Sequence, residues 1–183
     1  MFIQTEQTPN PATLKFLPGR DVVPKGVVDF TDPQQAEASP LARRVFAVEG
    51  VTGVFLGADF VTVTKAPGED WYALKPAVLG AIMEHFLSGE PVIEADAAAE
   101  DAVPGDEDEL AKQIRELIDT RVRPAVAQDG GDIIFRGFDR GIVYLHMRGA
   151  CSGCPSSTIT LKNGIENLLR YYVPEVIEVR PVA

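Results

Sequence analysis

An acidic stretch in the middle of the chain divides it into two halves. Residues 94–109 carry eight acidic and no basic side chains, with a Pro-Gly pair among them. A segment rich in Ala, Asp and Glu with such a pair is typical of an exposed, charge-extended linker and cannot bury a core. We therefore predict two small domains, residues 1–93 and 106–183, joined by an acidic linker at 94–105.

The bulk properties of the chain limit its class and its partners. With 183 residues, 45% of them hydrophobic, each half can bury a modest core. No apolar run approaches a membrane span, and residues 1–6 lack the basic start of a secretory signal, so no membrane partner is expected. Basic residues are neither clustered nor interleaved with aromatic ones, which argues against nucleic acid as a partner. Two closely spaced cysteines favour a reducing compartment, cytoplasmic by default, although a processed organellar protein would have the same composition.

The first half has the pattern of a small α+β domain, a mixed sheet with two helices. Ser39-Pro40 and Asp70 are helix-start signals, and the second helix is expected to end near Gly89. The half contains no cysteine and no nucleophile–base pair, so we predict a partner-docking role for it. Trp71 and His85 are interpreted as packing residues rather than as recognition or ligand groups. Strand-like runs cover residues 2–5, 13–17, 27–30, 51–56 and 60–64.

The second half predicts an α-β-β-α-β domain. Asp106 and Glu109 have the spacing of a capping box at the start of a helix, and Pro124 is expected to break that helix. Apolar residues then alternate with polar ones in two strand-like segments, and a third strand follows the last helix. The three strands are expected at residues 133–138, 142–148 and 176–182.

Cys151 and Cys154 are the two cysteines of the chain, and they form a C-x-x-C pair between a predicted strand and a predicted helix. The dipole of a helix N-terminus stabilises negative charge and lowers the pKa of a nearby thiol. Gly149 and Gly153 allow the tight turn that would point both sulfurs outward. We therefore expect two exposed, ionisable thiols.

Spacing alone leaves three chemistries open for this pair, namely a soft-metal or cluster ligand, a redox dithiol and a structural disulfide. A structural zinc ion or an iron-sulfur cluster normally takes four protein ligands, and this chain has two sulfurs. A cluster would therefore require two chains around a two-fold axis, each giving Cys151 and Cys154. His146 is the nearby alternative ligand, but it falls on the strand face opposite Val143, Leu145 and Met147 and is interpreted as a structural or surface residue.

The residues around the pair resemble a known family. Asp129-Gly130-Gly131-Asp132, residues 149–157 and residues 160–166 are similar to the C-terminal domain of the Nfu/NifU iron-sulfur scaffold family. Thr5-Glu6-Gln7-Thr8-Pro9-Asn10-Pro11 and Leu14-Lys15-Phe16 are similar to the N-terminal domain of two-domain Nfu proteins. No cysteine precedes Cys151, so the chain resembles the shorter carrier type, without the three-cysteine scaffold domain and ferredoxin-like insert of full-length NifU.

The resemblance implies a carrier and not an enzyme. It implies a 4Fe-4S cluster held between the two subunits of a homodimer, with Cys151 and Cys154 as ligands. It also implies upstream cluster donors and apo iron-sulfur proteins as acceptors. The alternative function is a C-x-x-C dithiol-disulfide oxidoreductase, and a shared zinc site is a third interpretation.

Overall fold

The computed structural model describes residues 2–24, 27–94, 108–151 and 155–182, and it divides the chain into two compact units, Met1–Glu100 and Asp101–Ala183. Each unit has its own hydrophobic core. Most of the predicted linker lies outside the described residues, so the boundaries at 93 and 106 stay predictions. Of the described residues, none belongs to a helix that is both long and apolar enough to cross a membrane.

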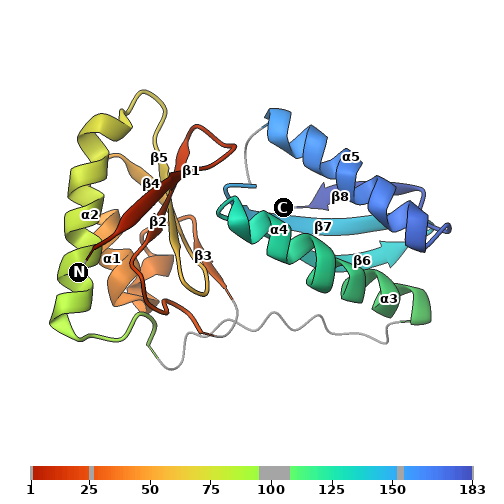
Figure 1. Ribbon diagram of the computed structural model, residues 1–183, viewed down its shortest axis with the longest axis horizontal. Helices are drawn as coiled ribbons and strands as arrows, with labels where there is room; N and C mark the ends of the chain where they lie inside the picture. Colours follow the sequence, from red (N-terminus) through yellow and green to blue (C-terminus); the bar gives the residue numbers. More distant parts are fainter. Residues whose placement is uncertain (1, 25–26, 95–107, 152–154, 183) are drawn as a thin grey trace. The chain divides into compact units, whose positions relative to one another are not determined.

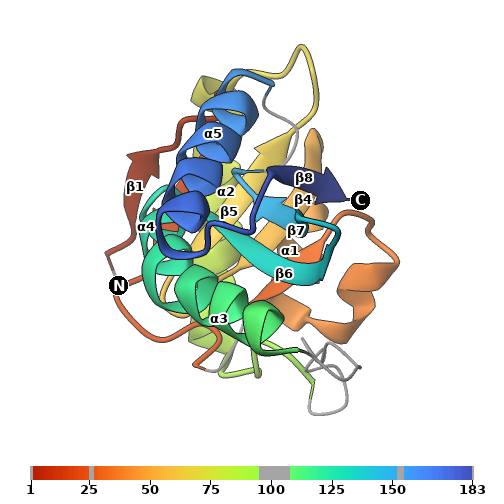
Figure 2. The same ribbon diagram turned by 90° about the vertical axis from the view of Figure 1, so that its right-hand side faces the viewer.

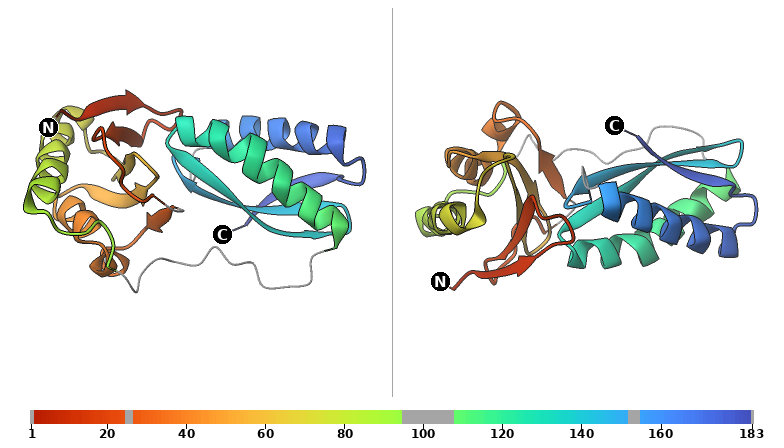
Figure 3. Two further views of the ribbon diagram at one scale, coloured as in Figure 1. Left: turned by 60° about the horizontal axis from the view of Figure 1, so that its bottom comes forward. Right: turned by 90° about the horizontal axis from the view of Figure 1, so that it is seen from above.

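The first unit is a five-stranded sheet covered by helices, and Figures 1 and 3 show α1 and α2 on the same face of it. The strand order is β1-β2-β5-β4-β3. The elements are β1 (Gln4–Gln7), β2 (Thr13–Leu17), β3 (Val28–Phe30), η1 (Gln35–Ala38), α1 (Pro40–Phe46), β4 (Val51–Leu56), β5 (Val61–Lys65) and α2 (Trp71–Ser88).

The predicted α+β class is confirmed, but the sheet of the first unit is not mixed. All four of its strand pairs are antiparallel. Two of them are formed by hairpins, β1 with β2 and β4 with β5. Between β3 and β4, the helices η1 and α1 return the chain to the end where β3 finishes, so β4 runs the opposite way, with Phe30 opposite Val54.

Local capping groups fix the helices of this unit where the sequence predicts them. The Ser39 hydroxyl accepts a hydrogen bond from the Ala42 backbone N–H at 3.1 Å, and Pro40 occupies the first turn of α1. Asp70 accepts one from the Tyr72 backbone N–H at 3.0 Å at the start of α2. Gly89 ends α2 with a φ of +76°, a conformation that glycine adopts without strain.

The second unit packs helices on one face of a three-stranded sheet, as Figure 2 shows for α3, α4 and α5. β6 and β7 are antiparallel, and β7 and β8 are parallel. The predicted α-β-β-α-β order is confirmed. The elements are α3 (Glu109–Leu117), the π-helix η2 (Ile118–Val122), α4 (Arg123–Gln128), β6 (Gly131–Asp139), β7 (Ile142–Gly149), α5 (Pro155–Tyr172) and β8 (Glu178–Val182).

Two details of the first helical segment differ from the sequence prediction. Asp108 caps α3, since its carboxylate accepts a hydrogen bond from the Ala111 backbone N–H at 2.8 Å. Asp106, the predicted cap, lies outside the described residues. Pro124 does not break the helix, because the chain widens into the π-helix η2 just before it and Pro124 then occupies the first turn of α4, where a missing N–H is tolerated.

Candidate functional site

Cys151 lies just after β7, against the turn that leads into β6. Gly149 closes β7 with a φ of +62°, and Gly130 enters β6 with a φ of +79°. The Ala150 backbone N–H donates a hydrogen bond to the Gly130 carbonyl at 3.2 Å, and Gly131 is the register partner of Gly149. The end of β7 and the start of β6 therefore hold Cys151 between them.

Gly131 provides the space that the Cys151 side chain occupies. A Cβ atom built on Gly131 would lie 2.4 Å from Cys151 Sγ and 3.0 Å from the Cys151 backbone nitrogen. Real side chains do not approach this closely, so any other residue at 131 would displace the thiol. The Gly130-Gly131 pair is part of the family resemblance, but nothing in the sequence predicts its contact with Cys151.

The Cys151 thiol is buried, contrary to the expectation of two exposed, ionisable thiols. Its residue is 6% exposed, and it packs in the hydrophobic core of the second unit. Burial, together with the nearby carboxylates of Asp129 and Asp132, raises the pKa of the Cys151 thiol to about 12. The helix dipole acts within the first turn, and α5 begins only at Pro155. Cys154 and Gly153 lie outside the described residues.

A buried ion pair fixes the turn beside Cys151. Asp132 is 3% exposed, and its two carboxylate oxygens each accept a hydrogen bond from Arg123 at 2.9 Å, one from Nε and one from Nη2. The hydrogen bond to Asp132 also raises the pKa of Arg123 above its usual range. Arg123 contacts Asp119 as well, at 3.4 Å. Local sequence patterns gave no signal for this clamp between α4 and β6.

The other polar residues considered near the cysteines lie next to side chains of the same unit. His146 Nδ1 lies 3.2 Å from Arg136 Nη2, and His146 is on the face of β7 opposite its three buried neighbours, as predicted. The Lys162 ammonium lies 3.6 Å from a Glu178 carboxylate oxygen in a partly exposed ion pair. Arg148 faces Asp132 in the register of β6 and β7.

One chain offers few side chains that could bind a metal ion or a cluster. The described residues contain no group of three or more His, Cys, Asp and Glu side chains that could hold a metal ion. Cys151 is a free thiol, a soft donor of the kind that iron-sulfur clusters and zinc take. The whole chain has two cysteines, so four protein thiolates require a second chain or another protein.

Comparisons with known proteins match both units. The family "Scaffold protein Nfu/NifU N terminal" matches residues 3–89, and the "NifU-like domain" family matches residues 114–180. The chain is 53% identical to a Drosophila erecta protein named "NFU1 iron-sulfur cluster scaffold homolog, mitochondrial" and 51% identical to a Homo sapiens protein of the same name. Both likenesses cover 100% of this chain, which spans 65% of the length of the fly protein and 72% of the human one.

A solved NifU-like protein from Saccharomyces cerevisiae is 30% identical to this chain, with a TM-score of 0.42, and the likeness covers 52% of this chain and 86% of the yeast one. The family assignment rests on the relatives that match both units.

Proposed function

This chain belongs to the Nfu family of iron-sulfur cluster scaffold proteins, and from that premise we propose that it holds a 4Fe-4S cluster between two copies of itself and transfers it to apo-proteins. The family consists of scaffold proteins and not of enzymes, as the sequence analysis predicts. The cluster is a cargo in this proposal, and the two copies form a homodimer through it.

One observation carries the proposal. The likeness to relatives named as iron-sulfur cluster scaffolds extends over the whole chain, and the chain has a single cysteine pair, Cys151 and Cys154, in which to hold such a cargo. Because two sulfurs are half of a four-thiolate set, the count favours a cluster shared by two chains. The free Cys151 thiol beside the Gly130-Gly131 turn supports its role as one of the ligands.

Transfer of the cluster to an acceptor is a ligand exchange. An acceptor thiol gives up its proton and forms a bond to iron. The departing cysteine sulfur breaks its bond to the same iron and takes up a proton. No electron moves in this exchange, so it needs neither oxidant nor reductant. Cluster donors would load the carrier by the same exchange in the opposite direction.

The first unit, which contains no cysteine, would contribute recognition. We assign it a docking role toward cluster donors or acceptors, because both relatives retain it beside the NifU-like unit. Deletion of residues 1–93 is then expected to slow transfer to some acceptors and not to others. Equal transfer to every acceptor after this deletion would contradict the docking role.

The cellular compartment belongs to the same proposal. The free Cys151 thiol favours a reducing compartment, cytoplasmic by default. The names of the fly and human relatives place those proteins in mitochondria. Fractionation of the source cells with an antibody against this chain decides between the two compartments.

Anaerobic reconstitution with iron and sulfide tests the cluster proposal. We expect a brown dimer with about one 4Fe-4S cluster per two chains, determined from the absorption spectrum, from iron and sulfide analysis and from the oligomeric mass. Cys151→Ala and Cys154→Ala should each remove both the cluster and the dimer and leave the far-ultraviolet circular dichroism unchanged. The unaltered chain treated with zinc serves as the control for a colourless metal-linked dimer.

Two outcomes would contradict the cluster proposal. A normal cluster in either cysteine variant would remove the ligand assignment. A colourless, metal-free chain with disulfide-exchange turnover would favour the oxidoreductase alternative.

A further inference from the structure

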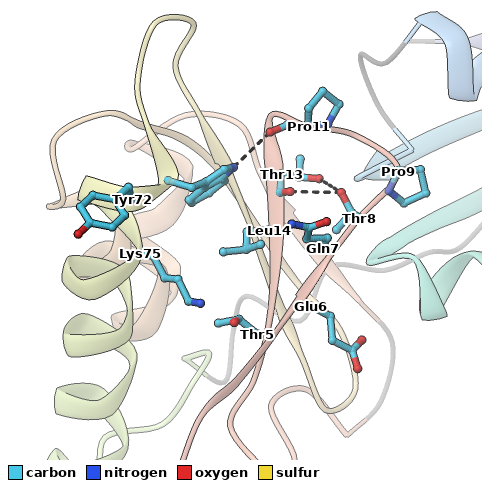
Figure 4. A pocket seen from close by; sticks show the side chains of 11 residues that line it. Thr5, Glu6, Gln7, Thr8, Pro9, Pro11, Thr13, Leu14, Tyr72 and Lys75 are labelled. Carbon is cyan, nitrogen blue, oxygen red and sulfur yellow. Dashed lines mark hydrogen bonds between the residues drawn. The ribbon is translucent and has the colours of Figure 1, made fainter.

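The first unit contains a cleft between the start of α2 and the hairpin of β1 and β2. Its volume is about 610 Å³. Figure 4 shows the Lys75 side chain pointing from α2 toward the hairpin. Its lining includes Trp71, Tyr72 and Lys75 from α2, Thr5 and Gln7 from β1, and Leu14 from β2. The segment from Thr5 to Pro11, which the sequence analysis singles out, forms much of one wall.

The strand that borders the cleft is an edge strand. β1 is at the end of the strand order and pairs with β2, with Thr5 opposite Phe16 and Gln7 opposite Leu14. No strand pairs with its other edge in the part of the chain that the structure describes. A free strand edge presents backbone N–H and C=O groups that an extended segment can use. β1 therefore offers a peptide backbone a strand edge next to the cleft.

Two aromatic side chains stand at the rim of the cleft, one fixed and one exposed. The Trp71 indole Nε1–H donates a hydrogen bond to the Pro11 carbonyl at 3.2 Å, and the Trp71 ring packs edge-on against Phe16. Tyr72, by contrast, is 90% exposed. A fixed tryptophan beside a free tyrosine is typical of surfaces that anchor an apolar side chain of a partner.

The charges in the cleft favour an acidic ligand. Lys75 is half-buried, points into the cleft in Figure 4 and forms no ion pair with another described residue. Glu6 also lines the cleft, but its carboxylate lies 3.6 Å from the Lys15 ammonium. The lysine charge at Lys75 is therefore available to a ligand, whereas the Glu6 charge is largely compensated within the chain.

We propose that this cleft binds an extended acidic peptide segment of a partner protein. The segment lies along β1, places an apolar side chain between Tyr72 and Leu14, and brings a carboxylate to the Lys75 ammonium. This mode of binding combines strand addition with one side-chain pocket. The inference does not depend on cluster carriage, since none of these residues belongs to the cysteine site.

Selection of random twelve-residue peptides displayed on their messenger RNA tests the inference. The bait is the full-length chain, and the Tyr72→Ala/Lys75→Glu double variant serves for counter-selection. We expect enriched peptides with at least one acidic residue and alternating β-branched or aromatic residues. The best peptide, made synthetically with a fluorescent label, then gives dissociation constants by anisotropy. Failure to enrich any peptide, or enrichment without acidic residues, would overturn the inference.

Single variants separate the cleft from unspecific binding. Lys75→Glu should raise the dissociation constant at least tenfold, and Tyr72→Ala should raise it several-fold. Tyr171→Ala removes a tyrosine of similar exposure, 79%, from the second unit and should leave the dissociation constant unchanged. Lys112→Glu reverses a charge in the second unit and should also change nothing. Equal binding by the cleft variants and these controls would overturn the inference.

Hydrogen exchange distinguishes an extended peptide from any other occupant. Strand addition predicts slower exchange of amides within residues 4–7 when the peptide is bound. Unchanged exchange in β1, or loss of a chain–chain association in the Tyr72→Ala variant, would show a different occupant. The Cys151→Ala/Cys154→Ala variant should bind the peptide normally, so failure of the cluster proposal and failure of this one are distinguishable.

Discussion

The two units bury ionisable groups in opposite ways. In the first unit His85 is completely buried, and neither of its ring nitrogens has a hydrogen-bond partner among the described residues. In the second unit Asp132 is almost as deeply buried, but both of its oxygens bind Arg123. A buried polar group without a partner costs stability, whereas a two-point charged pair fixes the geometry of its neighbours.

The difference indicates where each unit needs a defined geometry. Asp132 follows Gly131, which provides the space for the Cys151 thiol, so the clamp acts on the turn that holds a proposed cluster ligand. His85 lies in the C-terminal half of α2, away from the N-terminal half that borders the cleft, and it packs edge-on against Phe86. The unpartnered imidazole thus lies away from the proposed ligand, whereas the buried carboxylate next to the Cys151 turn is partnered.

Removal of the Arg123 side chain gives the largest expected effect. Arg123→Met removes both Arg123 hydrogen bonds from the buried Asp132 carboxylate, which should destabilise the second unit by about 3 kcal/mol. This is the low end for a broken buried pair, because the Arg123 side chain is 27% exposed. Trp71 is the single tryptophan of the chain, so its fluorescence reports the first unit. Hydrogen exchange of β7 amides in the native chain reports the second.

The matched control for this variant is Arg44→Met in the first unit. Arg44 contacts Glu84 at 2.9 Å and Glu90 at 2.8 Å, and both glutamates are largely exposed. Solvent screens these pairs. Arg44→Met should therefore lower the unfolding free energy of the first unit, measured by Trp71 fluorescence, much less than Arg123→Met lowers that of the second unit, measured by β7 exchange. Equal losses of unfolding free energy in the two variants would show that the Arg123–Asp132 pair stabilises the chain no more than a surface ion pair does.

Substitution of Gly131 tests the space around the Cys151 thiol. Gly131→Ala should destabilise the second unit by about 1–3 kcal/mol, because its Cβ and Cys151 Sγ cannot occupy the same place. In a Cys154→Ser background, the displaced Cys151 should react faster with an aromatic disulfide reagent. Gly137→Ala is the matched control on the same strand, since nothing lies within 4 Å of a Cβ there. Equal reaction rates in the two alanine variants would show that Gly131 does not provide the space for the Cys151 thiol.

Local signals made much of the fold predictable. Ser39, Asp70 and Gly89 mark helix ends through hydrogen bonds and backbone angles that involve neighbours in the sequence, and the structure has all three. The cysteine pair stands out for a similar reason, because its spacing is local. Family resemblance added the domain types, which the comparisons confirm.

The contacts that the sequence did not reveal are tertiary. Arg123 and Asp132 meet only when α4 packs against β6, and Gly131 meets Cys151 only when β6 pairs with β7. The expected exposed thiol at Cys151 was wrong for the same reason. A helix dipole can be read from sequence order, but burial in a core formed by distant residues cannot.

Acid should destabilise the first unit through His85, which gives the smallest of these effects near neutral pH. Burial lowers the pKa of His85, the charges of Arg44 and Arg20 lower it further, and Glu90 opposes them. The unfolded chain therefore binds a proton at a higher pH than the folded one. Stability is retained above the unfolded pKa near 6.5 and falls below it by up to about 1.4 kcal/mol per pH unit.

Replacement of His85 by leucine should remove this pH dependence, because leucine has no proton to bind and leaves no buried nitrogen without a partner. Urea unfolding followed by Trp71 fluorescence at pH 7.5 and pH 5.0 measures the difference for the original chain and for His85→Leu. His146→Gln, in the second unit, is the control and should keep the full acid effect on the Trp71 transition. If acid destabilised His85→Leu as much as the original chain, the pH dependence would arise from groups other than His85. The contrast between His85 and Asp132 would then rest only on their hydrogen-bond geometry.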